Sequence, residues 1–111
     1  MTKTAYITTP IYYPSGAPHL GSAYTSLACD VYSRFKRLDG YDTKFLTGTD
    51  EHGLKIQRSA ELQNKSPQEY VDGMAAQFRE LTPIMNLSND DFIRTTEERH
   101  IKTATAFWKK L

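Results

Sequence analysis

One short polar segment, His19-Leu20-Gly21-Ser22, lies where a loop runs into a long predicted helix. The first turn of a helix carries free N–H groups and a partial positive charge, so it can bind an anion. His19 adds a donor that can reach phosphate oxygens. Gly21 has no Cβ, so a flat or charged ligand can lie against its backbone. An ordinary helix start with a histidine near its cap is the alternative interpretation.

A second polar loop, TGTDEHG at residues 47–53, could bind a cationic group. The carboxylate of Asp50 can pair with an ammonium or cap the helix that follows. Glu51 and His52 are metal-ligand types, but three adjacent side chains on one short loop point in different directions. We therefore predict no metal site in this loop.

Three apolar or aromatic side chains, Ile11, Tyr12 and Tyr13, lie in the first loop. Such residues can pack beneath a loop or build an apolar ligand pocket. The sequence alone leaves both interpretations open.

Hydrophobic periodicity and turn residues indicate the elements that must position these loops. The sequence predicts strands at 5–9, 43–47 and 92–95, and helices at 21–38, 54–63, 67–81 and from a capping box at 95–98 onward, with Pro83 ending or kinking the third helix. Helices that cross between short strands imply an α/β fold with a parallel sheet flanked by helices. Ligands of such sheets bind beyond the carboxyl ends of the strands, where both loops fall.

Apolar residues at helical spacing predict which side chains are buried. On the long helix the apolar stripe consists of Tyr24, Leu27, Ala28, Val31, Tyr32, Phe35 and Leu38. We expect this stripe to face the sheet, and we expect Met74, Phe78 and Trp108 to lie in the core.

Composition excludes several classes of protein. The 111 residues include 14 Lys and Arg against 13 Asp and Glu, a net charge of +1, which excludes a basic nucleic-acid-coating tail or an acidic solvating segment. No apolar run approaches the ~18–20 residues that span a membrane. The N-terminus lacks the pattern of a secretory signal or a transit peptide.

The single cysteine, Cys29, excludes an internal disulfide and a Cys-based zinc site within these residues, and it fits the reducing cytoplasm. The length allows one domain or part of one. The helical pattern at residues 101–111 stops without a cap. We therefore expect a natural N-terminus and a domain that continues beyond residue 111.

Taken together, the two loops resemble the class I aminoacyl-tRNA synthetases. TTPIYYPSGAPHLGS resembles the segment with their His-Ile-Gly-His element, and FLTGTDEHG resembles the element after the second strand. These versions of the loops, and DDFIRTTEERH further on, are similar to the methionyl-tRNA synthetases in particular. The four-residue element alone occurs in other nucleotidyltransferases, so the resemblance depends on both loops at this separation.

This resemblance implies that residues 1–111 are the N-terminal portion, an incomplete first half, of a Rossmann-type nucleotide-binding domain. Such enzymes activate methionine with ATP and Mg²⁺ to methionyl-adenylate and then transfer it to tRNA(Met). The residues that it assigns to ATP are His19, Leu20, Gly21 and Ser22, of which His19, Gly21 and Ser22 act in catalysis. The residues that it assigns to methionine are Ile11, Tyr13 and Asp50, with Asp50 on the ammonium.

The sequence departs from the family pattern at Ser22, where a histidine is usual. Serine is shorter and cannot carry a positive charge, so we predict that Ser22→His keeps or raises the adenylation rate. The family's Lys-Met-Ser-Lys-Ser loop, its cysteine-rich metal-binding insertion and its anticodon-binding domain are missing from these residues. We therefore expect residues 1–111 alone to be inactive, and any zinc to lie outside them.

Three other functions compete with this interpretation. One is a class I synthetase for a branched aliphatic amino acid. Another is a small nucleotidyltransferase with the same His-x-Gly element. The last is a truncated relative that binds RNA or protein without catalysis, although the sequence has no basic stripe or aromatic stacking platform to support it.

Overall fold

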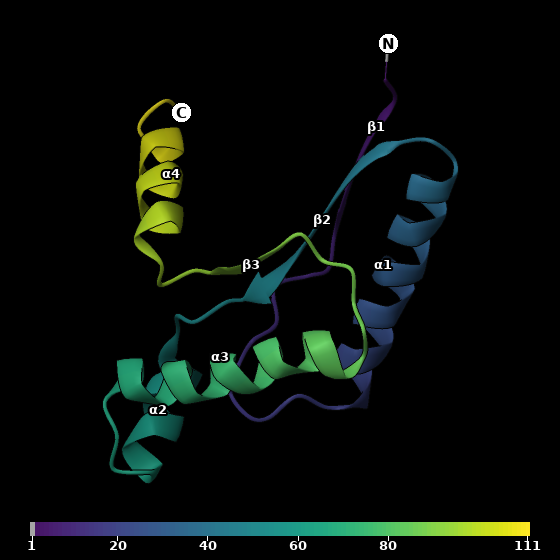
Figure 1. The fold of residues 1–111 in the computed structure, drawn as a ribbon. Coiled ribbons are helices and arrows are strands. Elements are labelled where there is room, and N and C mark those ends of the chain that lie inside the picture. Colours follow the sequence, from purple (N-terminus) through teal and green to yellow (C-terminus); the bar gives the residue numbers. More distant parts are fainter. Residues whose placement is uncertain (1) are drawn as a thin grey trace.

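A three-stranded parallel sheet forms the centre of the computed structural model, which describes residues 2–111 (Figure 1). Its strands are β1 (Thr4–Thr8), β2 (Asp42–Thr49) and β3 (Asp91–Arg94), in the order β1-β2-β3. The register pairs Ile7 with Phe45 and Gly48 with Ile93. The predicted parallel α/β fold is confirmed, and the ends of the predicted strands shift by only one or two residues.

Four helices connect and follow the strands: α1 (Leu20–Leu38), α2 (Leu54–Leu62), α3 (Pro67–Ile84) and α4 (Glu98–Trp108). The predicted start of α3 is confirmed, because Ser66 and Glu69 form a capping box. The Ser66 hydroxyl accepts a hydrogen bond from Glu69 N at 3.2 Å, and Ser66 N donates to the Glu69 carboxylate at 2.9 Å. No helix among residues 2–111 combines the length and hydropathy that a membrane-spanning helix needs.

Pro83 lies inside the last turn of α3, so the helix runs past the predicted end at residue 81. A proline removes the N–H that would reach the carbonyl four residues earlier, which is that of Arg79. Here the Thr82 hydroxyl donates to the Arg79 carbonyl at 2.8 Å. This substitute bond explains why the helix can continue for one residue beyond the proline.

The predicted capping box at residues 95–98 is wrong. Glu97 is the N-cap of α4 and forms no side-chain cap bond. The hydroxyls of Thr95 and Thr96 instead bond to Glu51 in the loop after β2. Trp108 is also not in the core, because 78% of it is exposed and the whole of α4 stands apart from the sheet (Figure 1).

The packing of α1 contradicts the prediction from its apolar stripe. Its buried residues are small or polar, namely Ser22, Ser26, Asp30 and Ser33. The stripe faces away from the sheet, with Tyr24 74% and Leu38 90% exposed. Polar burial is tolerated because each buried group has a partner: Ser33 donates to the Cys29 carbonyl at 2.7 Å, and Asp30 accepts from Ser88 and Arg34.

The core lies between the helices and one face of the sheet. Ile56 and Ala60 of α2 pack with Tyr70 and Val71 of α3, and Phe45 of β2 is fully buried. On the other sheet face, Tyr6 is exposed beside its register partner Lys44. The two polar loops leave the carboxyl ends of β1 and β2 and lead into α1 and α2, respectively.

Candidate active site

The two predicted loops lie side by side at the carboxyl edge of the sheet. Tyr12 forms an isolated parallel bridge with Thr49, the last residue of β2. Tyr12 N donates to the Gly48 carbonyl at 2.9 Å, and Asp50 N donates to the Tyr12 carbonyl at 2.8 Å. These backbone bonds place the residues on either side of Tyr12 next to Asp50.

Tyr12 anchors the first loop to two helices. Its hydroxyl donates to the Ser22 carbonyl at 3.1 Å and shares a hydrogen bond of 2.8 Å with the Ser26 hydroxyl. Its ring stacks on Phe78 of α3, with ring centroids 5.6 Å apart. Burial raises the pKa of the Tyr12 phenol. Of the two interpretations that the sequence left open, both apply to Tyr12, because it packs beneath the loop and also lines the pocket described below.

His19 is the N-cap of α1, and its Nδ1 accepts a hydrogen bond from Gly21 N at 3.0 Å. An accepting Nδ1 carries no proton, so Nε2 is the N–H donor of this ring. A Cβ on Gly21 would lie 2.9 Å from the His19 ring. Glycine at this position therefore makes room for the imidazole of His19, a role that we did not predict for it.

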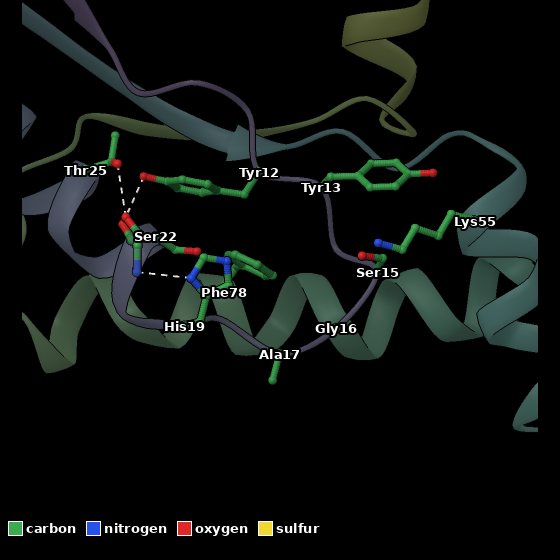
Figure 2. Close-up of a pocket in the computed structure, with 11 residues that line it drawn as sticks. Tyr12, Tyr13, Ser15, Gly16, Ala17, His19, Ser22, Thr25, Lys55 and Phe78 are labelled. Carbon is green, nitrogen blue, oxygen red and sulfur yellow. Dashed lines mark hydrogen bonds between the residues drawn. The ribbon is translucent and has the colours of Figure 1, made fainter.

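A pocket of about 540 Å³ opens between the first loop and the starts of α1 and α2 (Figure 2). Its lining residues are Tyr12, Tyr13, Ser15, Gly16, Ala17, His19, Gly21, Ser22, Thr25, Lys55 and Phe78. None of them is acidic, one is a lysine, and the N-terminus of α1 lies among them. The pocket therefore presents hydroxyls, an imidazole and positive charge, which suits a ligand with an anionic part and an apolar or aromatic part.

The predicted site residues are only partly collected in this pocket. His19, Gly21, Ser22 and Tyr13 line it, but Leu20, Ile11 and Asp50 do not. Leu20 is 85% exposed and points away from the protein's interior.

Asp50 does not cap α2. The N-cap of α2 is Gly53, which forms no side-chain cap bond. Among the partners within residues 2–111, the carboxylate of Asp50 accepts only a long hydrogen bond, 3.5 Å, from His52 N. Of the two roles that the sequence allowed for Asp50, helix capping is thus excluded. Its half-buried carboxylate stays available for a cationic group.

Tyr13 and Gly53 join the two loops at the edge of the pocket. Gly53 has a φ of 131°, in a region that side chains disfavour. A Cβ there would also lie 2.5 Å from the Tyr13 hydroxyl. Glycine is therefore needed at this position both for the turn into α2 and for the approach of the tyrosine.

Glu51 holds the second loop in place through a buried network. Its side chain is fully buried, and its carboxylate accepts from Arg94 Nε at 2.7 Å, from Arg94 Nη2 at 3.0 Å and from the hydroxyls of Thr49 and Thr96. Glu51 N donates to the Thr95 hydroxyl at 2.8 Å. The hydrogen bond to Glu51, and a second one to Asp72, raise the pKa of Arg94. Glu51 is a structural residue of this loop.

Within residues 2–111, no three His, Cys, Asp or Glu side chains lie close enough to hold a metal ion. The carboxylate oxygens of Glu51 already accept from Arg94 and two threonines. His52 Nε2 lies 3.3 Å from the Thr95 carbonyl and helps to fasten the loop to the end of β3.

Comparison with known proteins identifies the family. The sequence model described as tRNA synthetases class I (M) matches residues 5–111. The chain belongs to this family. The resemblance that the two loops indicated is therefore confirmed.

The relatives and the solved structure described below are several times longer than this chain. It is 56% identical to the methionine–tRNA ligase of Rickettsia bellii over 111 residues, which is all of this chain and 22% of the ligase. It is 57% identical to the Bacillus subtilis enzyme over 109 residues, 98% of this chain and 16% of that enzyme. The chain thus spans about a fifth of the length of its relatives.

A crystal structure of Mycobacterium tuberculosis methionyl-tRNA synthetase bound by methionyl-adenylate has the same fold in this region. The TM-score is 0.94 at 43% identity, over 96% of this chain and 21% of that one. The fold prediction, a part of a Rossmann-type domain, is therefore confirmed.

Sequence reasoning did not predict the contributions of Lys55, Phe78 and Arg94 to this candidate site. Lys55 lines the pocket, but it stands at an ordinary helix start where no motif marks it. Phe78 was predicted in the core; it is buried, and it also lines the pocket. Arg94 lies on β3, and only its charge, opposite to that of Glu51, could have suggested the pairing.

Proposed function

We infer that this chain supplies the methionine-activating site of a methionine–tRNA ligase. The carboxylate of methionine attacks the α-phosphorus of ATP, a P–O bond forms, and pyrophosphate leaves with the electrons of the broken bond. The product is methionyl-adenylate, which a terminal ribose hydroxyl of tRNA(Met) then attacks to release AMP. The observation that carries this proposal is a pocket at the start of α1 whose lining residues include no Asp or Glu, in a chain that belongs to this family.

His19 and the start of α1 supply electrostatic help for the first step. The Nε2–H of His19 and the free N–H groups of the helix can donate to phosphate oxygens while negative charge builds on pyrophosphate. Leu20, Gly21 and Ser22 form this first turn, in which Gly21 N already donates to His19 Nδ1, so the N–H groups left for a phosphate are those of Leu20 and Ser22. Magnesium enters as part of the ATP substrate, whose phosphate oxygens are ligands that it prefers.

Asp50 is our candidate for the methionine ammonium. Its carboxylate has no strong partner within residues 2–111, and a charge-assisted pair with an ammonium would give it one. Tyr13 and Ile11 flank the Tyr12 backbone that bonds to Asp50, so they can form the wall around the thioether side chain. One cysteine in 111 residues fits a cytoplasmic enzyme, as protein synthesis requires.

The test uses a hybrid enzyme in which residues 1–111 replace the matched segment of the R. bellii ligase. Amino-acid-dependent exchange of pyrophosphate into ATP is measured with each of the twenty amino acids. We expect exchange with methionine alone. Exchange with a different amino acid, or none from a hybrid that folds as the parent ligase does, would overturn the proposal.

Substitution at Asp50 tests the contribution of this chain to the hybrid. We expect Asp50→Ala to lower kcat/KM for methionine roughly a hundredfold or more, the order seen when one partner of a desolvated charge pair is removed. Asp42→Ala is the matched control, because Asp42 is exposed at the other end of β2. Equal losses in the two variants would contradict the assigned role.

A further inference from the structure

Lys55 is the one lysine or arginine that lines the pocket, and it has no partner in residues 2–111. No carboxylate within that range forms an ion pair with it, although eight other ion pairs are present. Figure 2 shows its side chain extending from α2 toward Ser15, across the pocket from His19. The charge of Lys55 therefore faces the pocket without a neutralising group.

The position of Lys55 in its own helix gives no local reason for a lysine. It is the second residue of α2, whose first turn contains no acidic residue. The positive end of the helix dipole disfavours a cation there. Within residues 2–111 neither a cap, nor an ion pair, nor burial involves the Lys55 ammonium, and the observation that points to a role is its position on the pocket.

We propose that Lys55 binds the phosphate chain of ATP and stabilises the pyrophosphate that leaves. This assignment rests on the proposed function, and it deepens it by adding a cation on the side of the pocket opposite His19. Pyrophosphate gains negative charge as the P–O bond breaks, so a cation placed on it binds the transition state more tightly than the substrate. A cation on the methionine carboxylate would slow the reaction instead, because it would make the attacking oxygen a weaker nucleophile.

The test compares Lys55→Met with Lys55→Arg in the hybrid enzyme. We expect Lys55→Met to lower kcat/KM for ATP about tenfold, the order expected for one charge-assisted contact, with KM for methionine unchanged. Lys55→Arg keeps the charge and should restore most of the activity. Arg58→Met is the matched control, because Arg58 is an exposed cation one turn further along α2 and does not line the pocket.

Three results would overturn the assignment: unchanged ATP kinetics in Lys55→Met, a rise in KM for methionine alone, or the same loss in Arg58→Met. Calorimetric titration with ATP keeps the test separate from the proposed function. If the unsubstituted hybrid exchanged no pyrophosphate, the proposed function would fail, and weaker ATP binding by Lys55→Met would still support the phosphate contact. Equal ATP affinity in the two proteins would then reject it.

Discussion

The loops that follow β1 and β2 are fixed to the rest of the protein by different kinds of side chain. The first loop leaves Tyr13 and His19 exposed, and its main side-chain anchor is Tyr12, which reaches down to α1 and α3. The second loop has its anchor within it, because Glu51 is fully buried and bonds to Arg94. The candidate ligand-binding groups of the first loop thus lie beside an aromatic anchor, Tyr12, and those of the second loop lie beside a charged anchor, Glu51.

This difference shows how a site can combine adaptable and rigid parts. A tyrosine anchor with two hydrogen bonds can shift at a modest cost. A buried carboxylate that loses its arginine is left with an uncompensated charge, which costs much more. We therefore expect Asp50, next to Glu51, to be held more rigidly than His19.

The largest effect on stability is expected from Glu51→Ala. The change leaves the Arg94 guanidinium and the Thr49 and Thr96 hydroxyls without their shared acceptor. Removing one partner of a buried ion pair costs about 3–5 kcal/mol. Denaturant unfolding of the hybrid, with amide hydrogen exchange in β2 and β3 as the local readout, measures this loss.

Asp72→Asn is the control for Glu51→Ala, since Asp72 also accepts from Arg94, at 2.5 Å, but is half-exposed. We expect it to cost less than about 1 kcal/mol, as exposed pairs do. The hydrogen bond from Arg94 lowers the pKa of Asp72, so its small contribution is present at neutral pH and is lost as the pH falls below the usual aspartate range. Equal costs for the two variants would remove the contrast between the anchors.

A smaller effect is expected from Tyr12→Phe, which keeps the stacking on Phe78 and removes both hydroxyl bonds. We expect a loss of about 1–2 kcal/mol at neutral pH. Because burial raises the pKa of Tyr12, the unfolded chain loses this proton at a lower pH than the folded one. Stability from this anchor is therefore present below pH ~10 and declines as the pH rises above it.

Unfolding at a series of alkaline pH values tests this dependence. Tyr12→Phe should show a weaker decline than the unsubstituted hybrid, because it has no phenol to ionise. Tyr24→Phe serves as the control, since Tyr24 is 74% exposed on α1. An identical alkaline decline in the Tyr12→Phe hybrid would show that this phenol does not anchor the loop.

The sequence was sufficient to predict the order of strands and helices and the loops that form the site. Those features depend on local patterns, such as the Ser66 capping box and the apolar periods. The direction in which α1 packs does not follow from the sequence of the helix alone. Its apolar stripe and its small polar stripe are both regular. The polar stripe packs inward because Tyr12 and Ser88, which lie outside the helix, and Arg34, one turn after Asp30, satisfy its polar groups.

The same reason explains what was missed in the site. Thr95 and Thr96 have the local pattern of a helix cap. Their hydroxyls instead form hydrogen bonds with Glu51, which lies more than forty residues earlier in the chain. Lys55 belongs to the pocket only because α2 starts opposite α1. Roles that depend on a partner far away in the chain cannot be predicted from spacing alone.

A last variant, Ser22→His at the start of α1, puts a larger side chain in place of a buried serine that lines the pocket. The hydrogen bond from Tyr12 goes to the backbone carbonyl of Ser22, so the substitution leaves the first anchor intact. The side chain lines the pocket, where an imidazole would add a donor near the position that we propose for the ATP phosphates. We expect the rate of adenylate formation in the hybrid, measured in a single turnover with methionine and ATP, to be kept or raised. A clear fall, with unfolding unchanged, would show that serine is matched to its surroundings here, and that this part of the first loop is as constrained as the second.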